Sequence, residues 1–169
     1  MILYIVIAIV LLLIFLFWFS GFIFGAPFQS SSTKARKQML KLSKVRKGQR
    51  VADLGSGTGK LVIGFARKGA KVTGFEINPF LVWISRRKIK ALGLQKNAKI
   101  EQKNFWNTNL SYFDIITVFQ IGYVMGRLGK KLEKEVKRKR KKLIVISNTW
   151  KFPGRKPEKK EGYVRLYRF

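Results

Sequence analysis

The sequence of 169 residues contains no cysteine and no histidine. The absence of cysteine excludes disulfide bridges and thiolate metal sites, and without histidine a zinc or iron site would depend on carboxylates alone. Acidic residues are also scarce, with 8 Asp and Glu against 36 Lys and Arg. We therefore predict a protein without a metal site.

The charge balance is strongly positive, with a formal net charge of +28, and every charged residue lies at or beyond Lys34. A field of this sign attracts anionic partners such as lipid headgroups, nucleic acid or an acidic protein surface. Charge alone does not choose between these partners. Nucleic acid therefore stays open as a partner that the sequence does not favour.

The first 24 residues form an apolar stretch without a charge. Ile2 to Phe24 is long enough to span a hydrocarbon core of about 30 Å at a rise of about 1.5 Å per residue. A cleaved signal peptide is one alternative, although no basic residue precedes the apolar run, and a buried core helix is another. Basic residues follow from Lys34 onward. We therefore predict a transmembrane helix over residues 1–24, in a single-pass membrane protein whose folded domain faces the cytoplasm.

The chain beyond residue 24 divides into a connector with a first helix, residues 25–47, and one α/β domain, residues 48–169. In this domain apolar, β-branched runs alternate with helical patterns. The predicted strands are 51–54, 71–75, 99–101, 113–119 and 143–147, with a last edge strand over 163–169. The predicted helices are 58–68, 79–92 and 123–139. Such alternation is typical of a Rossmann-like, doubly wound and mostly parallel sheet with helices on both faces.

A glycine-rich turn follows the first strand of this domain. It reads Gly55-Ser56-Gly57-Thr58-Gly59 and leads directly into a helix. Glycines allow positive φ and a close approach of the backbone to a ligand. A plain tight turn and a phosphate-binding turn of a dinucleotide site are the alternatives.

Two acidic residues stand beside this turn. Glu76 ends the second predicted strand, where a carboxylate can accept hydrogen bonds from both ribose hydroxyls of an adenosine ligand. Asp53 precedes the turn, where it either braces the glycines or faces the ligand. A carboxylate at this place suits a cationic ligand without phosphate and repels a pyrophosphate. The pair therefore favours an adenosine ligand with positive charge.

The segments Asp53–Gly59 and Gly74–Trp83 resemble the class I S-adenosylmethionine-dependent methyltransferases. Within this class the sequence is similar to the small membrane-associated protein lysine methyltransferases, which include the ATP synthase c-subunit and adenine nucleotide translocase enzymes and archaeal relatives. The resemblance covers residues 25–169. Its further matches are Ala26-Pro27-Phe28, Asn104-Phe105-Trp106, Leu110-Ser111-Tyr112-Phe113-Asp114, and Val118-Phe119 leading to Met125 and Leu128-Gly129-Lys130-Lys131-Leu132.

The resemblance implies a protein-lysine N-methyltransferase that uses S-adenosylmethionine and acts on a membrane-associated protein. The residues implied in cofactor binding are Asp53, Gly55, Ser56, Gly57, Gly59, Glu76, Asn78, Asn104 and Phe105. Gln120 and Tyr123 are implied in holding the acceptor nitrogen. For Tyr123 the alternative is a side chain that only packs against the protein. The substrate entrance would be lined by Pro27, Phe28, Ser31 and Trp150. An RNA methyltransferase and an inactive cofactor-binding membrane module remain the alternative functions.

The sequence departs from the family pattern at three places. Ser31 stands where the family has a threonine in Pro-Phe-Val-Pro-Thr. Asn104 replaces an acidic residue that accepts a hydrogen bond from the adenine amino group, and an amide carbonyl can still accept it without charge. Little sequence follows the last parallel strand, so we expect a truncated C-terminal edge of the sheet. Asp114 lies at the amino end of its strand, away from the expected ligand crevice, and is predicted to be structural.

Overall fold

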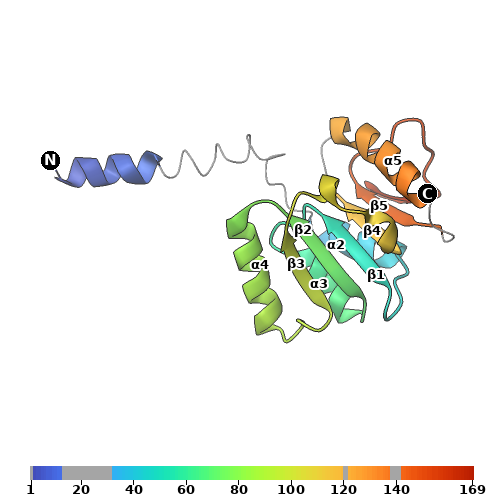
Figure 1. The fold of residues 1–169 in the computed structure, drawn as a ribbon, viewed down its shortest axis with the longest axis horizontal. Coiled ribbons are helices and arrows are strands. Elements are labelled where there is room, and N and C mark those ends of the chain that lie inside the picture. The colour runs from blue at the N-terminus through green and yellow to red at the C-terminus, as the bar shows by residue number, and fades with distance from the viewer. Residues whose placement is uncertain (1, 13–31, 120–121, 138–141) are drawn as a thin grey trace.

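The computed structural model describes residues 2–12, 32–119, 122–137 and 142–169. At its centre is a seven-stranded sheet in the order β3-β2-β1-β4-β5-β7-β6 (Figure 1). The strands β1 to β5 are parallel, and β7 runs antiparallel between β5 and β6. The prediction of a doubly wound, mostly parallel sheet is confirmed. The strands are β1 Arg50–Leu54, β2 Lys71–Glu76, β3 Ala98–Gln102, β4 Ile115–Val118, β5 Ile144–Asn148, β6 Lys159–Glu161 and β7 Val164–Arg168.

Helices cover both faces of this sheet. One face carries α2 (Thr33–Leu42), α3 (Lys60–Arg67) and α4 (Pro79–Ala91), and the other carries α5 (Gly122–Val136). The connection from β3 to β4 contains two short 3₁₀ helices, η1 (Phe105–Asn107) and η2 (Leu110–Tyr112). Right-handed crossovers explain this division. From β1 to β3 the chain moves across the sheet in one direction, and from β4 to β5 it moves in the opposite direction, so the connecting helices lie on opposite faces.

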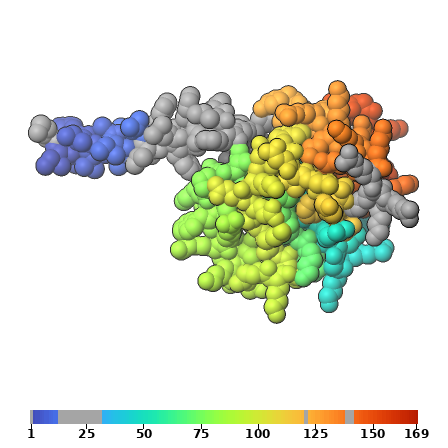
Figure 2. Space-filling view, in the orientation of Figure 1, coloured from blue at the N-terminus to red at the C-terminus, as the bar shows by residue number. Residues whose placement is uncertain are grey.

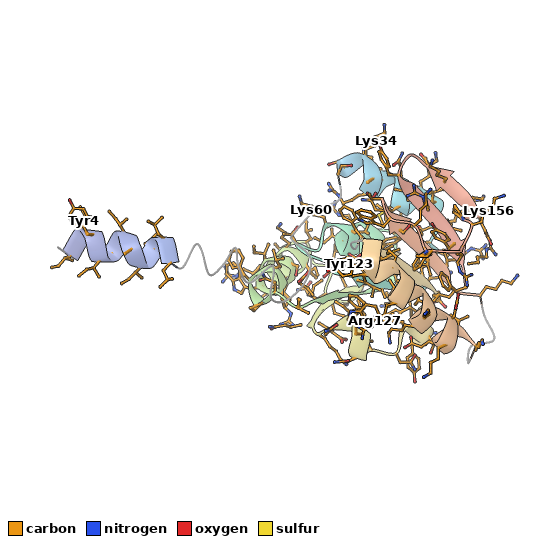
Figure 3. The ribbon with its side chains drawn as sticks, turned by 90° about the horizontal axis from the view of Figure 1, so that it is seen from above. Tyr4, Lys34, Lys60, Tyr123, Arg127 and Lys156 are labelled. Carbon is orange, nitrogen blue, oxygen red and sulfur yellow. The ribbon has the colours of Figure 1, made fainter. Side chains whose placement is uncertain are left out.

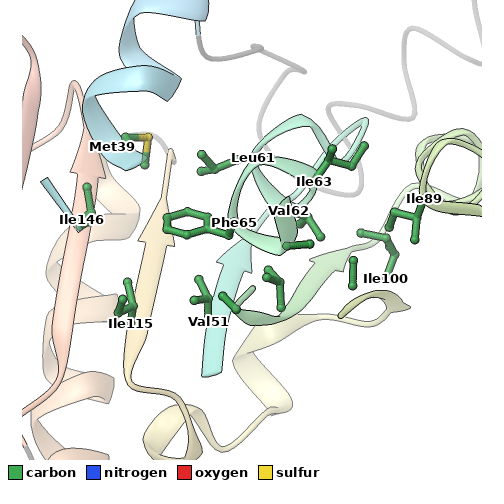
Figure 4. Close-up of a cluster of buried hydrophobic side chains, with 14 of the residues drawn as sticks. Met39, Val51, Leu61, Val62, Ile63, Phe65, Ile89, Ile100, Ile115 and Ile146 are labelled. Atoms are coloured by element: carbon green, nitrogen blue, oxygen red, sulfur yellow. The ribbon is translucent and has the colours of Figure 1, made fainter. Parts of the chain in front are cut away.

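The two faces bury separate hydrophobic cores. Consecutive strand residues alternate between them, so Val51 joins the core under α2, α3 and α4, and Ala52 joins the core under α5. Figure 4 shows the first core, in which Met39 of α2 and Phe65 of α3 lie over the strands. The central strands β1, β4 and β5 are mostly apolar because both faces of the sheet are covered there.

The order of the strands reverses between β1 and β4. In open α/β sheets the ligand crevice lies beyond the carboxyl ends of the strands at such a switch point. The carboxyl ends of β1 and β4, at Leu54 and Val118, therefore lie side by side at the expected ligand edge. Asp114 lies at the opposite edge, where its Oδ2 accepts a hydrogen bond of 2.8 Å from the Arg50 backbone N–H. This position agrees with a structural role.

The predicted truncation of the C-terminal sheet edge is wrong. β7 pairs with β5 over Ile144↔Arg168 to Asn148↔Val164, and β6 pairs with the outer side of β7. The two outer strands are joined by the two-residue turn Gly162-Tyr163, in which Gly162 has a φ of 60°. A glycine with positive φ in the first position is typical of a type II′ hairpin, so the pair needs few residues.

The predicted membrane location is contradicted. Residues 2–12 are helical, and in the part of the chain that the structure describes no helix has both the length and the apolar character needed to cross a bilayer. The second half of the predicted span, residues 13–24, lies outside the described residues. The boundaries proposed at residues 24 and 47 stay predictions, and α2 lies within the segment 25–47.

Candidate functional site at the carboxyl edge of the sheet

The glycine-rich turn connects β1 to α3 with an unusual backbone. Gly55, Gly57 and Gly59 have φ values of 76°, 53° and 73°. These values lie in the left-handed region, which glycine adopts at little cost. At Gly59 a Cβ would also lie 2.9 Å from the Cβ of Ser85 in α4. The turn therefore needs glycine for its conformation and for its packing against α4.

The backbone N–H groups of this turn bond mainly to the protein itself. Those of Gly55 and Ser56 both donate to the Phe75 carbonyl at 2.9 Å, and that of Gly59 donates to the Ser56 carbonyl at 2.9 Å. The Gly57 N–H donates to Oε2 of Glu76 at 2.8 Å. A phosphate-binding turn presents such groups to its ligand. The observed pattern therefore argues against the dinucleotide alternative.

Glu76 links the turn to the end of β2. Its Oε1 accepts hydrogen bonds of 2.9 Å from the N–H groups of Ile77 and Asn78, and the side chain is buried. A carboxylate has about four lone-pair positions, so three backbone donors leave room for a further donor. Glu76 thus holds the turn in place and still has capacity to accept a ligand hydroxyl.

Asp53 is a second buried carboxyl group at this edge. Its Oδ1 accepts a hydrogen bond of 2.8 Å from the Thr117 hydroxyl of β4. Burial raises the pKa of the Asp53 carboxyl from its usual 3.8 to about 7, the bond from Thr117 opposes this rise, and the nearby Glu76 carboxylate adds to it. A cationic ligand would lower the pKa again, because it stabilises the ionised carboxylate.

Ser56 supplies a buried hydroxyl that the described residues leave without a hydrogen-bond partner. It fits beside β2 because residue 74 is glycine, where a Cβ would lie 2.7 Å from both the Cβ and the Oγ of Ser56. Buried hydroxyls are normally paired, so this one is available to a ligand or a water molecule. Together with two buried carboxyl groups it fits the polar and cationic parts of S-adenosylmethionine.

The two asparagines expected in the cofactor site have local hydrogen bonds. Asn78 caps α4, because its Oδ1 accepts from the Phe80 N–H at 2.9 Å and the Leu81 N–H at 3.3 Å. Asn104 caps η1 through a bond of 3.1 Å from the Trp106 N–H. Phe105 is half-buried, with its ring 4.9 Å from that of Trp106. Both asparagines follow the carboxyl ends of their strands, β2 and β3, and their role toward a cofactor stays a prediction. Figure 2 shows the green surface of α4 at the left of the folded domain, and α4 contacts the neighbouring strand β3.

The residues predicted to hold the acceptor follow β4 and β5 in the sequence. Tyr123 stands in the first turn of α5 and is 79% exposed, so the packing alternative does not describe it (Figure 3). Trp150 follows β5 and lies against Gly122, where a Cβ would be 2.9 Å from its Cε3 atom. The structure therefore brings Trp150 to the residue next to Tyr123. Gln120, Pro27, Phe28 and Ser31 lie outside the described residues.

Sequence reasoning missed three residues that shape this edge. Thr117, Gly74 and Gly122 are not predicted as site residues. Thr117 donates a hydrogen bond to Asp53, Gly74 leaves room for Ser56, and Gly122 lies against Trp150. The signal for Thr117 is a hydroxyl within the apolar strand Ile115–Val118. The two glycines give no signal by themselves, because their partners are remote in sequence.

Comparison with known proteins places the chain among methyltransferases. The family described as ANTKMT methyltransferase domain matches residues 53–159. The human ATP synthase c-subunit lysine N-methyltransferase is 34% identical over 136 residues, which is 80% of this chain and 57% of that protein. A protein-lysine N-methyltransferase of Saccharolobus islandicus is 30% identical over 78% of this chain and 81% of its own length. The chain thus spans little more than half the length of the human relative.

Solved structures give the same fold. The RNA methyltransferase of Salinibacter ruber, in complex with S-adenosyl-L-homocysteine, superposes with a TM-score of 0.73 and 25% identity, over 83% of this chain and 92% of that chain. The matched family segment contains the glycine turn, Glu76 and Trp150, which are the residues that build the edge described above. The chain therefore belongs to the ANTKMT methyltransferase domain family.

Proposed function

We propose that this protein is an S-adenosylmethionine-dependent protein-lysine N-methyltransferase. The observation that carries the proposal is the family match over residues 53–159, which covers the turn after β1 and the acceptor edge after β5 together. The names of the human and Saccharolobus relatives both state lysine N-methylation, and the second relative is covered over most of its length.

S-adenosylmethionine is the cofactor, as the sequence predicts, and when bound it supplies an electrophilic methyl group and a neutral thioether leaving group. Glu76 would accept a ribose hydroxyl, and the Ser56 hydroxyl offers a further polar contact. Asp53 supplies negative charge near Glu76, which balances a cationic ligand. Asn104 and Phe105, after β3, would hold the adenine.

The acceptor nitrogen must be neutral to react. An ammonium group has no lone pair, so the lysine loses a proton to solvent before its Nζ forms the bond to the methyl carbon. A pocket of low polarity beside a positive charge lowers the pKa of a lysine and favours this state. Tyr123 and Trp150 supply aromatic surface for such a pocket, and Gln120 follows β4 in the sequence, where it would hold the nitrogen. This chemistry needs positioning and desolvation more than an acid or base, so the absence of histidine is compatible with it.

The substrate that we propose is a lysine of a membrane-associated protein, in an apolar or acidic setting. The names of the human protein and of a mouse relative refer to the ATP synthase c-subunit and to adenine nucleotide translocase. A net charge of +28 repels a basic substrate segment and attracts an acidic one.

The test is transfer of a tritiated methyl group from S-adenosylmethionine to macromolecules of a cell extract, followed by separate digestion with protease and with RNase. Label that protease releases, and that mass spectrometry finds on lysine, supports the proposal. Label released by RNase alone overturns it. The Glu76→Ala variant controls for methylation by other enzymes in the extract.

RNA methylation is the second candidate. The positive charge and the likeness to the Salinibacter ruber enzyme favour it, and a tRNA (uracil(54)-C(5))-methyltransferase of Pyrococcus horikoshii is 34% identical over 53% of this chain. That protein is covered over 18% of its length only. The sequence contains no cysteine, so a mechanism with a thiolate nucleophile is excluded. The RNase arm of the same experiment decides between the two candidates.

A further inference from the structure

The turn that follows β5 has a strained backbone. The Trp150 N–H donates to the Asn148 carbonyl at 2.8 Å, which closes a three-residue turn with Thr149 at its centre. Thr149 has a φ of 68°. A γ-turn with positive φ is rare and strained, and a β-branched residue is disfavoured there. Such a conformation persists only where the surroundings enforce it.

Arg165 of β7 supplies this enforcement. Its Nη1 donates to the carbonyls of Thr149 at 2.7 Å and of Tyr163 at 2.8 Å. The Tyr163 carbonyl also accepts the Thr149 N–H at 3.0 Å, and the Ser147 hydroxyl donates to the Trp150 carbonyl at 2.8 Å. The turn is thus bound on both sides of Thr149, mainly from the hairpin that β6 and β7 form.

The burial of Arg165 is not explained by an ion pair. The side chain is 6% exposed, and no carboxylate of the described residues pairs with it. A buried cation without a counter-ion is costly, and an apolar residue of similar size would fill this place more favourably. The strand around it, Val164-Arg165-Leu166-Tyr167, is otherwise apolar. A hairpin that had only to pack would not need the charge.

Trp150 directly follows Thr149, whose carbonyl Arg165 binds. The indole lies over Gly122, with Cε3 and Cζ3 at 2.9 and 3.0 Å from the position of a Cβ, and it is 42% exposed. Gly122 begins α5 and is followed by the exposed Tyr123. A change in the turn would move the indole away from the start of α5, and with it one wall of the acceptor site.

We infer that Arg165 is a positioning residue of the acceptor site, which holds the strained turn at Thr149 so that Trp150 stays against Gly122. This inference rests on the proposed function, since it assigns the edge of Trp150 and Tyr123 to the acceptor. Arg165 itself touches the backbone of the turn and not the reacting atoms. Its loss therefore affects the acceptor step and leaves the cofactor side, at β1 and β2, unchanged.

The conformational test uses the full chain labelled with 5-fluorotryptophan, with Trp150→Phe to assign the Trp150 resonance by ¹⁹F NMR. Arg165→Met is expected to shift or broaden this resonance and to leave those of Trp83 and Trp106 in place. Thr149→Gly alone should resemble the unaltered protein, because glycine adopts positive φ without strain. The double variant should return toward the unaltered spectrum. An unchanged Trp150 resonance in Arg165→Met overturns the inference. So does a double variant whose Trp150 resonance is the same as that of Arg165→Met alone.

The kinetic test measures methyl transfer to total protein of an extract, together with cofactor affinity by calorimetry. Arg165→Met should reduce kcat/KM for the protein acceptors by about tenfold or more, with cofactor Kd changed by less than about twofold. Leu166→Ala is the matched control, since it weakens the packing of the same strand in the core under α2. It should not lower kcat/KM for the protein acceptors selectively while cofactor Kd is retained. Equal losses of cofactor affinity and turnover in Arg165→Met would show a merely structural role.

Two outcomes separate this inference from the proposed function. If the unaltered protein methylates no protein, the proposed function fails, and the ¹⁹F spectra still decide whether Arg165 positions Trp150. If Arg165→Met does not fold, Arg165→Lys takes its place. One ammonium cannot reproduce the guanidinium geometry at both carbonyls, so an intermediate spectrum and turnover are expected, and values equal to those of the unaltered protein overturn the inference.

Discussion

At the scale of single residues, two buried carboxyl groups have different tasks. Glu76 accepts three backbone hydrogen bonds and thereby fixes the glycine turn, whereas Asp53 accepts one from a hydroxyl and keeps a raised pKa. Glu76 holds the backbone of the turn and also faces the ligand edge. The ionised form of Asp53 is the one that a nearby cation stabilises most. This difference gives two separate predictions.

Glu76→Ala should weaken S-adenosylmethionine binding and also destabilise the turn. The loss of a charge-assisted ribose hydrogen bond is expected to cost about 2 to 3 kcal/mol, which corresponds to about 30- to 150-fold in Kd. Calorimetry measures the affinity and thermal unfolding measures the stability. Glu101→Ala, in the exposed pair with Lys99 on β3, is the control and should change neither quantity by much. Equal cofactor affinity in Glu76→Ala would remove it from the cofactor site.

Asp53 should make stability depend on pH. Between about pH 4 and pH 7 the carboxyl is protonated in the folded protein and ionised in the unfolded chain, so unfolding releases a proton. The free energy of unfolding should therefore fall as pH rises through this window, by at most about 1.4 kcal/mol per pH unit from this group, and level off above it. Urea unfolding at several pH values measures how the free energy of unfolding depends on pH in the unaltered protein and in Asp53→Asn. The difference between the two pH dependences should become smaller in saturating cofactor. Identical pH dependence in the two proteins contradicts the assignment.

At the scale of elements, α5 offers a matched pair of glycines. Gly122 lies under Trp150, whereas a Cβ at Gly126 would meet nothing closer than the Pro153 Cγ at 3.7 Å. Gly122→Ala should displace the indole and lower turnover, with cofactor affinity retained. Gly126→Ala should keep turnover and raise stability by about 0.5 to 1 kcal/mol, because alanine favours the helix. Methyl-transfer rates and melting temperatures check both. Similar behaviour of the two variants would mean that the Trp150 contact is unimportant.

At the scale of the whole molecule, the net charge of +28 is expected to make the protein bind polyanions without methylating them. An RNA oligonucleotide should bind with an affinity that falls by about tenfold or more between about 50 and about 200 mM salt. Binding of the cationic cofactor should change far less. Fluorescence anisotropy and calorimetry at several salt concentrations measure the two. An RNA affinity that resists salt, together with methyl transfer to the RNA, would favour the second candidate function.

The sequence alone predicted the parallel part of the sheet well, because its central strands β1, β4 and β5 are covered on both faces and read as mostly apolar, β-branched runs. It failed at β6, since Lys159–Glu161 is a short edge strand that joins the sheet through backbone pairing with β7 and carries no apolar pattern. The membrane prediction failed for another reason. Composition measures how apolar a segment is, whereas a membrane span also requires a continuous helix of sufficient length, which the described residues do not contain.

The sequence by itself determined that the glycines, Asp53 and Glu76 meet at one edge of the sheet, because they lie at the ends of two consecutive strands that pair in parallel. Only the tertiary structure decided the contacts that surround Asp53 and Trp150. Thr117 bonds to Asp53 across 64 positions of the chain, Trp150 rests on Gly122, and Arg165 holds the turn at Thr149. Contacts of this kind depend on which surfaces meet after the strands have been ordered, and no local pattern of residue types encodes that meeting.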